Sequence, residues 1–165
     1  MNKNEIRDLE KILGVKFSNQ NLLKQAFTHK SKSVNIQQNN ERLEFLGDRV
    51  LGLVIANYLN DTYPKDSEGI LDKKLASLVN KETCSNVILN LKLDRFLNLS
   101  KSQKNNKSGK KKILGDLCES IIGAIFIDKG FEITKKFIIK LWNDKLKNTS
   151  IVIIDPKTKL QEYSL

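Results

Sequence analysis

Apolar residues recur at helical spacing along most of the chain. In an amphipathic helix, apolar side chains return every three or four residues and mark the side that faces the core. No pair of alternating segments indicates neighbouring strands, and residues 151–154 (IVII) are an isolated β-prone run. The pattern predicts an all-α fold with helices over residues 4–14, 19–27, 40–59, 69–80, 81–91, 113–128 and 131–146.

Glycine, proline and polar runs separate these predicted helices. Gly14 follows the first helix as a C-cap, and Ser18 is a candidate N-cap for the second. Residues 63–69 (YPKDSEG) form a turn, because proline and the Glu-Gly pair interrupt helical periodicity. Residues 101–112 hold six lysines and no acidic residue, which is typical of an exposed loop or a connection between helices.

The third predicted helix carries three acidic residues on one side. Glu41, Glu44 and Asp48 lie within about 60° of each other around the helix axis. Leu51 and Ile55 continue this side with apolar residues, so it is not an ordinary solvated surface. The opposite side is apolar and is predicted to face the core: Leu43, Leu46, Val50, Leu53 and Val54.

The sixth predicted helix carries a second pair of acids, Asp116 and Glu119, on an otherwise apolar stretch. Charged groups in such surroundings destabilise a fold unless they are paired or bind metal, and this helix has few basic residues of its own. If the two acidic helices pack together, divalent cations would offset the repulsion between their carboxylates. Oxygen ligands suit magnesium or manganese, and Gly47, Gly52 and Gly123 permit close helix contact. The alternative is that each acid lies on a solvated surface and pairs along its own helix.

The chain has 165 residues, enough for one domain, and a net charge of +10. This surplus favours a polyanionic partner, and no apolar run reaches the roughly 18 residues of a membrane span, so nucleic acid is favoured. The alternative explanation of the positive charge is that an AT-biased genome has produced a lysine-rich surface. A basic surface around an acidic centre is consistent with a metal-dependent phosphodiesterase. The candidate RNA contacts are Lys107, Lys110, Lys111 and Lys112.

The remaining reactive side chains are few. The chain has two cysteines, Cys84 and Cys118, and no export signal, so we expect both to be free thiols in the core of a cytosolic protein. The sequence contains no grouping of cysteine and histidine that would indicate a zinc site. His29 is the only histidine, so RNA cleavage by a pair of histidines within one chain is excluded. We interpret His29 as a packing or hydrogen-bonding residue and Trp142 as a core residue.

Four short motifs occur in the order seen in a known family. Residues 41–48 (ERLEFLGD) resemble the signature of bacterial ribonuclease III, a double-stranded-RNA endonuclease. Residues 27–31 (FTHKS), the pair at 68–69 (EG) and residues 115–124 (GDLCESIIGA) resemble its other motifs. Gly115 departs from the alanine usual at its position, a change of small residue for small residue. The resemblance covers nearly the whole chain.

The resemblance implies an all-α, homodimeric endonuclease that cuts double-stranded RNA to leave 5′-phosphate and 3′-hydroxyl ends. It implies magnesium as the cofactor, with manganese as a substitute, and Asp48 and Glu119 as catalytic residues. Glu41 and Glu68 would be accessory acids near the subunit interface and the substrate. The implied metal ligands are Glu44, Asp48, Asp116 and Glu119.

The resemblance also implies the domain organisation and the partners. Residues 1–147 would be the catalytic domain, and residues 148–165 a linker and the start of a double-stranded-RNA-binding domain that stops just inside its first helix. The signature helix would form the dimer interface, with Leu51 and Ile55 on it. The expected substrates are precursor ribosomal RNA and structured messenger RNA, the expected location is the cytoplasm, and no membrane partner is expected.

Two other functions fit parts of the pattern. An all-α nucleotide pyrophosphohydrolase also places magnesium on paired helical acids, but it would not need a charge of +10. A duplex-RNA binder without catalysis could keep the same fold, but all four ligand positions are acidic in this chain.

Overall fold

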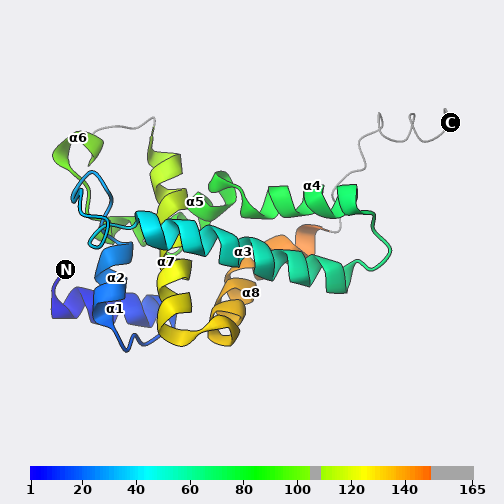
Figure 1. Ribbon diagram of the computed structural model, residues 1–165, viewed down its shortest axis with the longest axis horizontal. Coiled ribbons are helices and arrows are strands. Elements are labelled where there is room, and N and C mark those ends of the chain that lie inside the picture. Colours follow the sequence, from blue (N-terminus) through cyan, green and yellow to red (C-terminus); the bar gives the residue numbers. More distant parts are fainter. Residues whose placement is uncertain (105–108, 150–165) are drawn as a thin grey trace.

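The computed structural model describes residues 1–104 and 109–149, which fold into helices (Figure 1). Within these residues the only β-structure is an isolated bridge between Thr28 and Asn98, so the all-α prediction is confirmed. The predicted β-prone run at 151–154 lies outside the described residues. The helices are α1 Lys3–Leu13, α2 Gln20–Ala26, α3 Glu41–Thr62, α4 Glu68–Val79, α5 Lys81–Asn90, η1 Asp94–Phe96, α6 Lys101–Lys104, α7 Lys110–Lys129 and α8 Phe131–Asn148.

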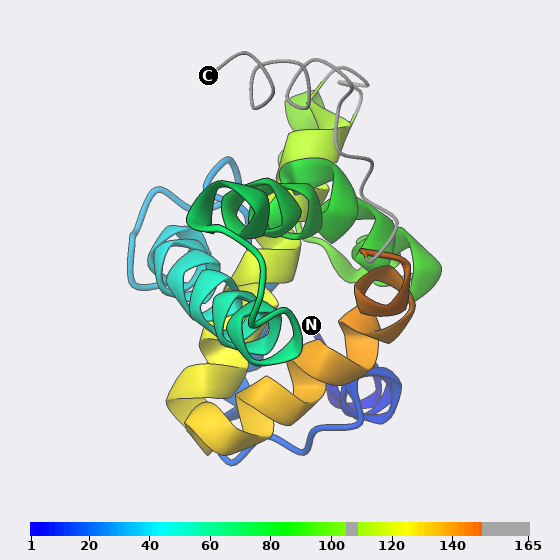
Figure 2. The ribbon, with the colours of Figure 1, turned by 90° about the vertical axis from the view of Figure 1, so that its right-hand side faces the viewer.

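α7 is the central helix of the fold. Every residue from Ile113 to Ile125 is buried, including both acids of the second motif. A helix that is apolar on all sides needs neighbours on all sides, and α2, α3, α5 and α8 all pack against α7. α3 crosses α7 and runs beside α4, as two views at right angles show (Figures 1 and 2). The two acidic motifs therefore lie on helices in direct contact.

Two glycines allow α3 and α7 to cross at very short distance. A Cβ atom on Gly47 would overlap the backbone carbonyl of Glu119, and a Cβ atom on Gly123 would overlap the carbonyl of Leu43. The predicted role of these glycines is confirmed. The same prediction is wrong for Gly52, because a Cβ atom there would meet nothing within 4 Å.

The predicted exposure of α3 needs two corrections. Leu51 and Ile55, which were expected on a dimer surface, are 0% exposed and belong to the core of the single chain. Leu53, which was expected in the core, is 59% exposed. The reason is that α4, α7 and α8 all contact α3, so its buried surface is wider than one stripe and is rotated from the predicted one.

The outer helices mostly follow their local signals. Gly14 adopts a left-handed conformation (φ 67°) at the end of α1, as predicted. The N-cap of α2 is Asn19 rather than Ser18, since the Asn19 side chain accepts the hydrogen bond of the Asn21 amide. The Asp128 carboxylate near the end of α7 accepts the Ser18 and Asn19 amides, each at 2.8 Å. This contact ties the start of α2 to the central helix.

The start of α7 lies earlier than predicted. Residues 110–112 were expected in a loop, but they form the first turn of α7, and residues 101–104 form the short helix α6. Trp142 and both cysteines are buried as predicted, and the indole Nε1 donates a 2.8 Å hydrogen bond to the carbonyl of Leu78. Among the described residues, no helix has the length and apolar character to cross a membrane.

Candidate metal centre

The crossing of α3 and α7 brings together acids that are about 70 residues apart in the chain. Glu44 comes from α3, and Asp116 and Glu119 come from adjacent turns of α7. Each offers a carboxylate oxygen, and these three oxygens lie within 4.8 Å of one another. Asp116 and Glu119 are buried, whereas Glu44 is partly exposed. The predicted convergence of the two acidic motifs is therefore seen at these three residues, which we call the acidic cluster.

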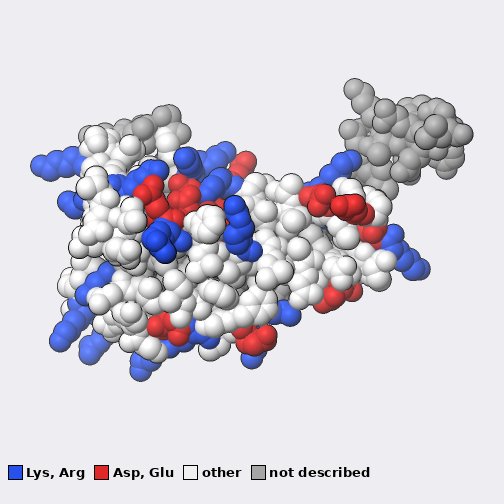
Figure 3. Space-filling view, viewed as in Figure 1, with Lys and Arg blue, Asp and Glu red and all other residues white. Residues whose placement is uncertain are grey.

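Asp48 and Glu41 flank the acidic cluster. Both line a hollow of about 380 Å³ together with Glu44 and Glu119. The Asp48 carboxylate pairs with Arg49 on the surface, and Glu41 pairs with Lys30 at 3.2 Å. The space-filling view shows a group of acidic side chains with basic side chains beside it (Figure 3). The hollow therefore has an acidic floor and basic groups at its edge.

Lys81 is the site residue that sequence reasoning missed. The buried part of α7, Ile113–Ile125, has no basic residue, but Lys81 enters from the first position of α5. Its Nζ lies 2.5 Å from Oδ1 of Asp116 and 2.7 Å from Oε2 of Glu119. Pairing along α7 itself is therefore absent among these contacts, as expected, and the partner of these acids comes from another helix. No local pattern reveals this contact, since Lys81 and Asp116 are 35 positions apart.

The crowding of the site shifts several pKa values. Burial raises the pKa of Glu119 to about 7, although the hydrogen bond and the charge of Lys81 act to lower it. Burial and the neighbouring Asp116 carboxylate raise the pKa of Glu44 above its ordinary value. Burial alone would lower the pKa of Lys81, but its bonds to Asp116 and Glu119 outweigh burial and raise that pKa. Lys81 therefore does not fully offset the effect of burial on the Glu119 carboxylate.

The residues present fit a divalent metal ion. The acidic cluster supplies three hard oxygen ligands in a partly buried setting, and Asp48 stands at the same hollow. Magnesium and manganese favour carboxylate oxygens of this kind. Burial raises the pKa of Glu119 in spite of Lys81, and a bound cation would favour the ionised carboxylate.

Other predicted site residues lie apart from the acidic cluster. Glu68 begins α4 and lines a different hollow with Leu59 and Asn60 at the far end of α3, so the single chain does not bring it to the cluster. Lys107 lies outside the described residues. The exposed Lys110 and Lys111 lie 3.9 Å from Asp94 and 3.5 Å from Glu82, respectively, and Lys112 is also exposed.

His29 is a buried hydrogen-bonding residue, as interpreted from the sequence. Its Nδ1 lies 2.9 Å from Oγ of Ser31, and the Ser31 amide donates to the same nitrogen at 3.1 Å. Its backbone amide donates to the carbonyl of Asn98. Burial and the charge of Lys30 lower the pKa of His29, which favours the neutral ring. These contacts hold the segment before α3 in place.

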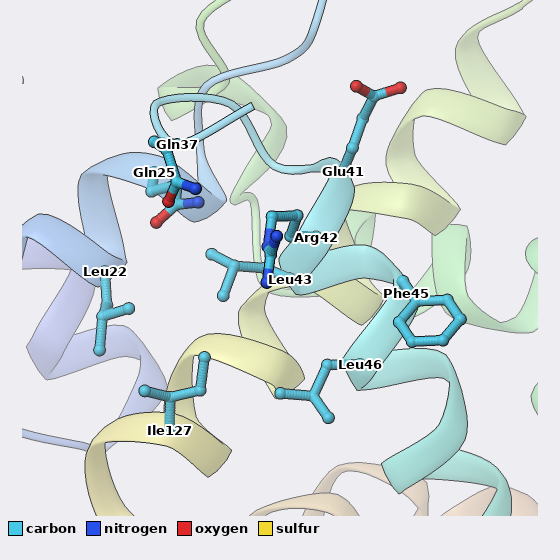
Figure 4. Close-up of a pocket in the computed structure, with 9 residues that line it drawn as sticks. All are labelled: Leu22, Gln25, Gln37, Glu41, Arg42, Leu43, Phe45, Leu46 and Ile127. Atoms are coloured by element: carbon cyan, nitrogen blue, oxygen red, sulfur yellow. The ribbon is translucent and has the colours of Figure 1, made fainter. Parts of the chain in front are cut away.

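An apolar groove lies beside the acidic hollow, on the other side of the start of α3. Figure 4 shows the side chains of Leu22, Leu43, Leu46 and Ile127 around it, from α2, α3 and α7. The groove measures about 750 Å³. Phe45 projects from its edge and is 66% exposed, and Ile127 is 53% exposed. A large exposed aromatic side chain next to an apolar groove is typical of a protein contact surface.

Comparisons with known proteins agree with this architecture. The family model described as Ribonuclease-III-like matches residues 19–146. A ribonuclease 3 of Pelagibacter ubique is 48% identical over 167 residues, which cover 100% of this chain and 73% of the relative. A ribonuclease 3 of Methylocella silvestris is 40% identical over 160 residues, covering 97% of this chain and 68% of the relative.

Solved structures give the same result. A crystal structure of the nuclease domain of Campylobacter jejuni ribonuclease III is similar with a TM-score of 0.76 at 42% identity, covering 93% of this chain and 100% of the other. A second structure of that domain, described as flexible in a region involved in dimer formation, has a TM-score of 0.77 at 44% identity and covers 84% of this chain and 96% of the other. The fold, the meeting of the two acidic motifs and these matches agree: the chain belongs to the ribonuclease III family of endonucleases.

Proposed function

We propose that this chain is a magnesium-dependent endoribonuclease that hydrolyses phosphodiester bonds in double-stranded RNA and leaves 5′-phosphate and 3′-hydroxyl ends. The observation that carries the proposal is the acidic cluster, whose three carboxylate oxygens lie within 4.8 Å of one another at the crossing of α3 and α7. Membership of the ribonuclease III family supports the reaction class and the duplex substrate.

The proposed metal ligands are the residues of the acidic cluster together with Asp48. A bound magnesium ion, or manganese in its place, would supply an activated water and stabilise the leaving 3′ oxygen. Asp48 and Glu119 are the proposed catalytic residues. Glu119 must give up its proton to bind the ion, and its raised pKa makes that step sensitive to pH near neutrality.

Basic residues around the acidic hollow are the proposed contacts to the RNA backbone. Lys30 and Arg49 line the hollow itself, and Lys110, Lys111 and Lys112 lie exposed on the first turn of α7. Phosphate contacts of this kind give affinity without reading the base sequence, and they weaken as salt rises. The proposed duplex substrates are precursor ribosomal RNA and structured messenger RNA, and the proposed place of action is the cytoplasm.

The proposed active form is a homodimer. Phe45 is too exposed for a large aromatic residue without a partner, and the apolar groove lies next to it (Figure 4). In a two-fold dimer, Phe45 of each subunit can enter the groove of the other, because such an interface pairs the same surface with itself. This surface replaces Leu51 and Ile55 as the proposed interface. Glu41 lies between the groove and the acidic hollow and is the proposed accessory acid at this boundary.

The domain boundary and the role of Glu68 are proposed from the sequence and do not depend on the contacts of the acidic cluster. Residues 1–147 are proposed as the catalytic domain, and residues 148–165 as a linker and the start of an RNA-binding domain; residues 150–165 lie outside the described residues. Glu68 is proposed to act on the substrate or at the interface in the dimer, since it is remote from the acidic cluster of its own chain.

A cleavage assay on long duplex RNA tests the proposed reaction. The wild-type chain is expected to cut duplex RNA with magnesium and to stop when a chelator is added. Asp48→Asn and Glu119→Gln are expected to abolish cleavage while dimerisation and RNA binding persist. Asp144→Asn and Glu132→Gln are matched controls, because both acids are exposed on α8 and lie outside the acidic hollow.

Two results would contradict the proposal. Undiminished cleavage by Asp48→Asn or Glu119→Gln in magnesium would remove these carboxylates from the mechanism. Hydrolysis of nucleoside triphosphates with no cleavage of duplex RNA would instead indicate a nucleotide pyrophosphohydrolase.

A further inference from the structure

The ammonium of Lys81 lies among the three carboxylates of the acidic cluster. Its Nζ contacts Oδ1 of Asp116 at 2.5 Å and Oε2 of Glu119 at 2.7 Å. Oε1 of Glu44, across the helix crossing, is 3.6 Å away. One side chain from α5 therefore contacts acids from both α3 and α7.

Gly115 makes room for this side chain. A Cβ atom on Gly115 would lie 2.7 Å from Cδ of Lys81 and 3.1 Å from the Lys81 backbone oxygen. Any larger residue would push the lysine stem or the start of α5 away from α7. Gly115, which stands where the family usually has alanine, is thus the residue that the Lys81 side chain passes on its way to the acidic cluster.

The other basic groups of the hollow are engaged elsewhere. Lys30 pairs with Glu41, and Arg49 pairs with Asp48. Among the described ion pairs, Lys81 is therefore the cation that contacts the acidic cluster. Three carboxylates and one ammonium leave a net negative charge in a partly buried place, so the cluster can still attract a divalent ion.

We propose that Lys81 is a positioning residue: its ammonium holds the acidic cluster together in the metal-free protein and competes with the divalent ion for the same oxygens. The inference rests on the proposed metal dependence. A magnesium ion binds oxygen at about 2.0–2.1 Å. An ammonium hydrogen-bonded to those same oxygens occupies the space that the ion needs, so binding of the ion displaces Nζ. The Lys81 side chain is 39% exposed and can move into the hollow without breaking the core.

The test removes the charge of Lys81 and keeps the length of its aliphatic side chain. Lys81→Met removes the ammonium from an unbranched side chain of similar length, and Lys73→Met on an exposed part of α4 makes the same change of net charge away from the hollow. Each full chain is titrated calorimetrically with Mn²⁺ and with Mg²⁺. Its thermal midpoint is then measured with chelator and with saturating Mg²⁺. Neither readout depends on RNA cleavage.

We expect Lys81→Met to bind the metal at least about tenfold more tightly than wild type, because the competing cation is gone. Its thermal midpoint should fall in chelator, where three carboxylates remain without a cation, and recover with Mg²⁺. Lys73→Met should match the wild type in both measurements. Simple damage to the fold would weaken metal binding, so tighter binding separates the proposed role from a structural one.

The outcomes separate this inference from the proposed function. Equal or weaker metal binding by Lys81→Met, with normal binding by wild type, overturns the role of Lys81 and leaves the metal centre intact. A wild type that binds neither ion overturns the metal dependence itself. If Lys81→Met does not fold in chelator, Gly115→Ala provides the second test, since its methyl group displaces the lysine stem and keeps the charge. This variant should also bind Mn²⁺ more tightly, and an unchanged or lower affinity would contradict the proposal.

Discussion

Gly47 of α3 faces the backbone carbonyl of Glu119 of α7 with no space for a side chain between them. The carboxylate of the same Glu119 belongs to the acidic cluster. Glu119 thus takes part in both features: its backbone in the helix crossing and its side chain in the candidate metal centre. The distance between Glu44 and Glu119 depends directly on how closely the two backbones approach.

Replacing this glycine should destabilise the protein. In Gly47→Ala the added methyl group overlaps backbone rather than a flexible side chain, so the helices must separate. Overpacking of this kind costs about 1–3 kcal/mol and sometimes more. Urea unfolding should show a clear drop in the free energy of unfolding.

Gly52→Ala is the matched control for this change. It lies on the same helix, and a Cβ atom there would meet nothing within 4 Å, so alanine should stabilise the helix by about 0.5–1 kcal/mol. Equal effects of the two substitutions would show that the close crossing does not constrain the fold.

The exposed ring of Phe45 should control dimerisation. Phe45→Ala removes a large apolar side chain from the proposed interface, and two-fold symmetry removes it twice. At about 25 cal/mol per Å² of buried apolar surface, the loss should weaken the dimer by more than about a hundredfold. Sedimentation velocity over a range of concentrations measures this shift. Leu89→Ala, an exposed apolar residue of α5, should leave the association unchanged. A Phe45→Ala chain that remains dimeric at wild-type concentrations would place the interface elsewhere.

The stability of the metal-free protein should fall as pH rises towards neutrality. Burial raises the pKa of Glu119 from 4.5 to about 7, so the folded chain holds a proton that the unfolded chain releases. The stability from this proton is complete below about pH 4.5 and is lost as pH passes about 7. Urea midpoints measured in chelator across this range should therefore decrease.

Metal binding should show the opposite trend. The ion needs the ionised carboxylate of Glu119, so its affinity should rise with pH up to about 7. Glu119→Gln should remove most of the pH dependence of the metal-free stability. Equal pH dependence of the midpoint in the wild type and in Glu119→Gln, both in chelator, would argue against a neutral Glu119 in the folded chain.

Asp128 should stabilise the junction between α2 and α7. Its carboxylate accepts two backbone amides, and its loss leaves both without this partner. A hydrogen bond to a charged group contributes about 1.5–3 kcal/mol, so Asp128→Ala should lower the free energy of unfolding by at least about 2 kcal/mol. Asp144→Ala on the exposed side of α8 is the control and should have little effect. Similar losses in the two variants would show that these bonds add nothing specific.

The sequence by itself determined the longer helices, the two acidic motifs and the family resemblance. These features depend on neighbours within a few positions: apolar spacing predicts a helix, and the spacing of Asp116 and Glu119 places both acids on adjacent turns. The glycines at 47 and 123 also indicated a close crossing, but the same signal at Gly52 was wrong, because a Cβ atom there would meet nothing within 4 Å.

Only the tertiary structure decided which sides of the helices are covered and which distant groups meet. Leu51 and Ile55 are in the core while Phe45 and Leu53 are exposed, because three neighbouring helices together set the buried surface of α3. Lys81 reaches the acidic cluster because α5 packs on α7 at Gly115. Such contacts depend on the angle and separation of helices far apart in the chain, and periodicity within one helix carries no information about either.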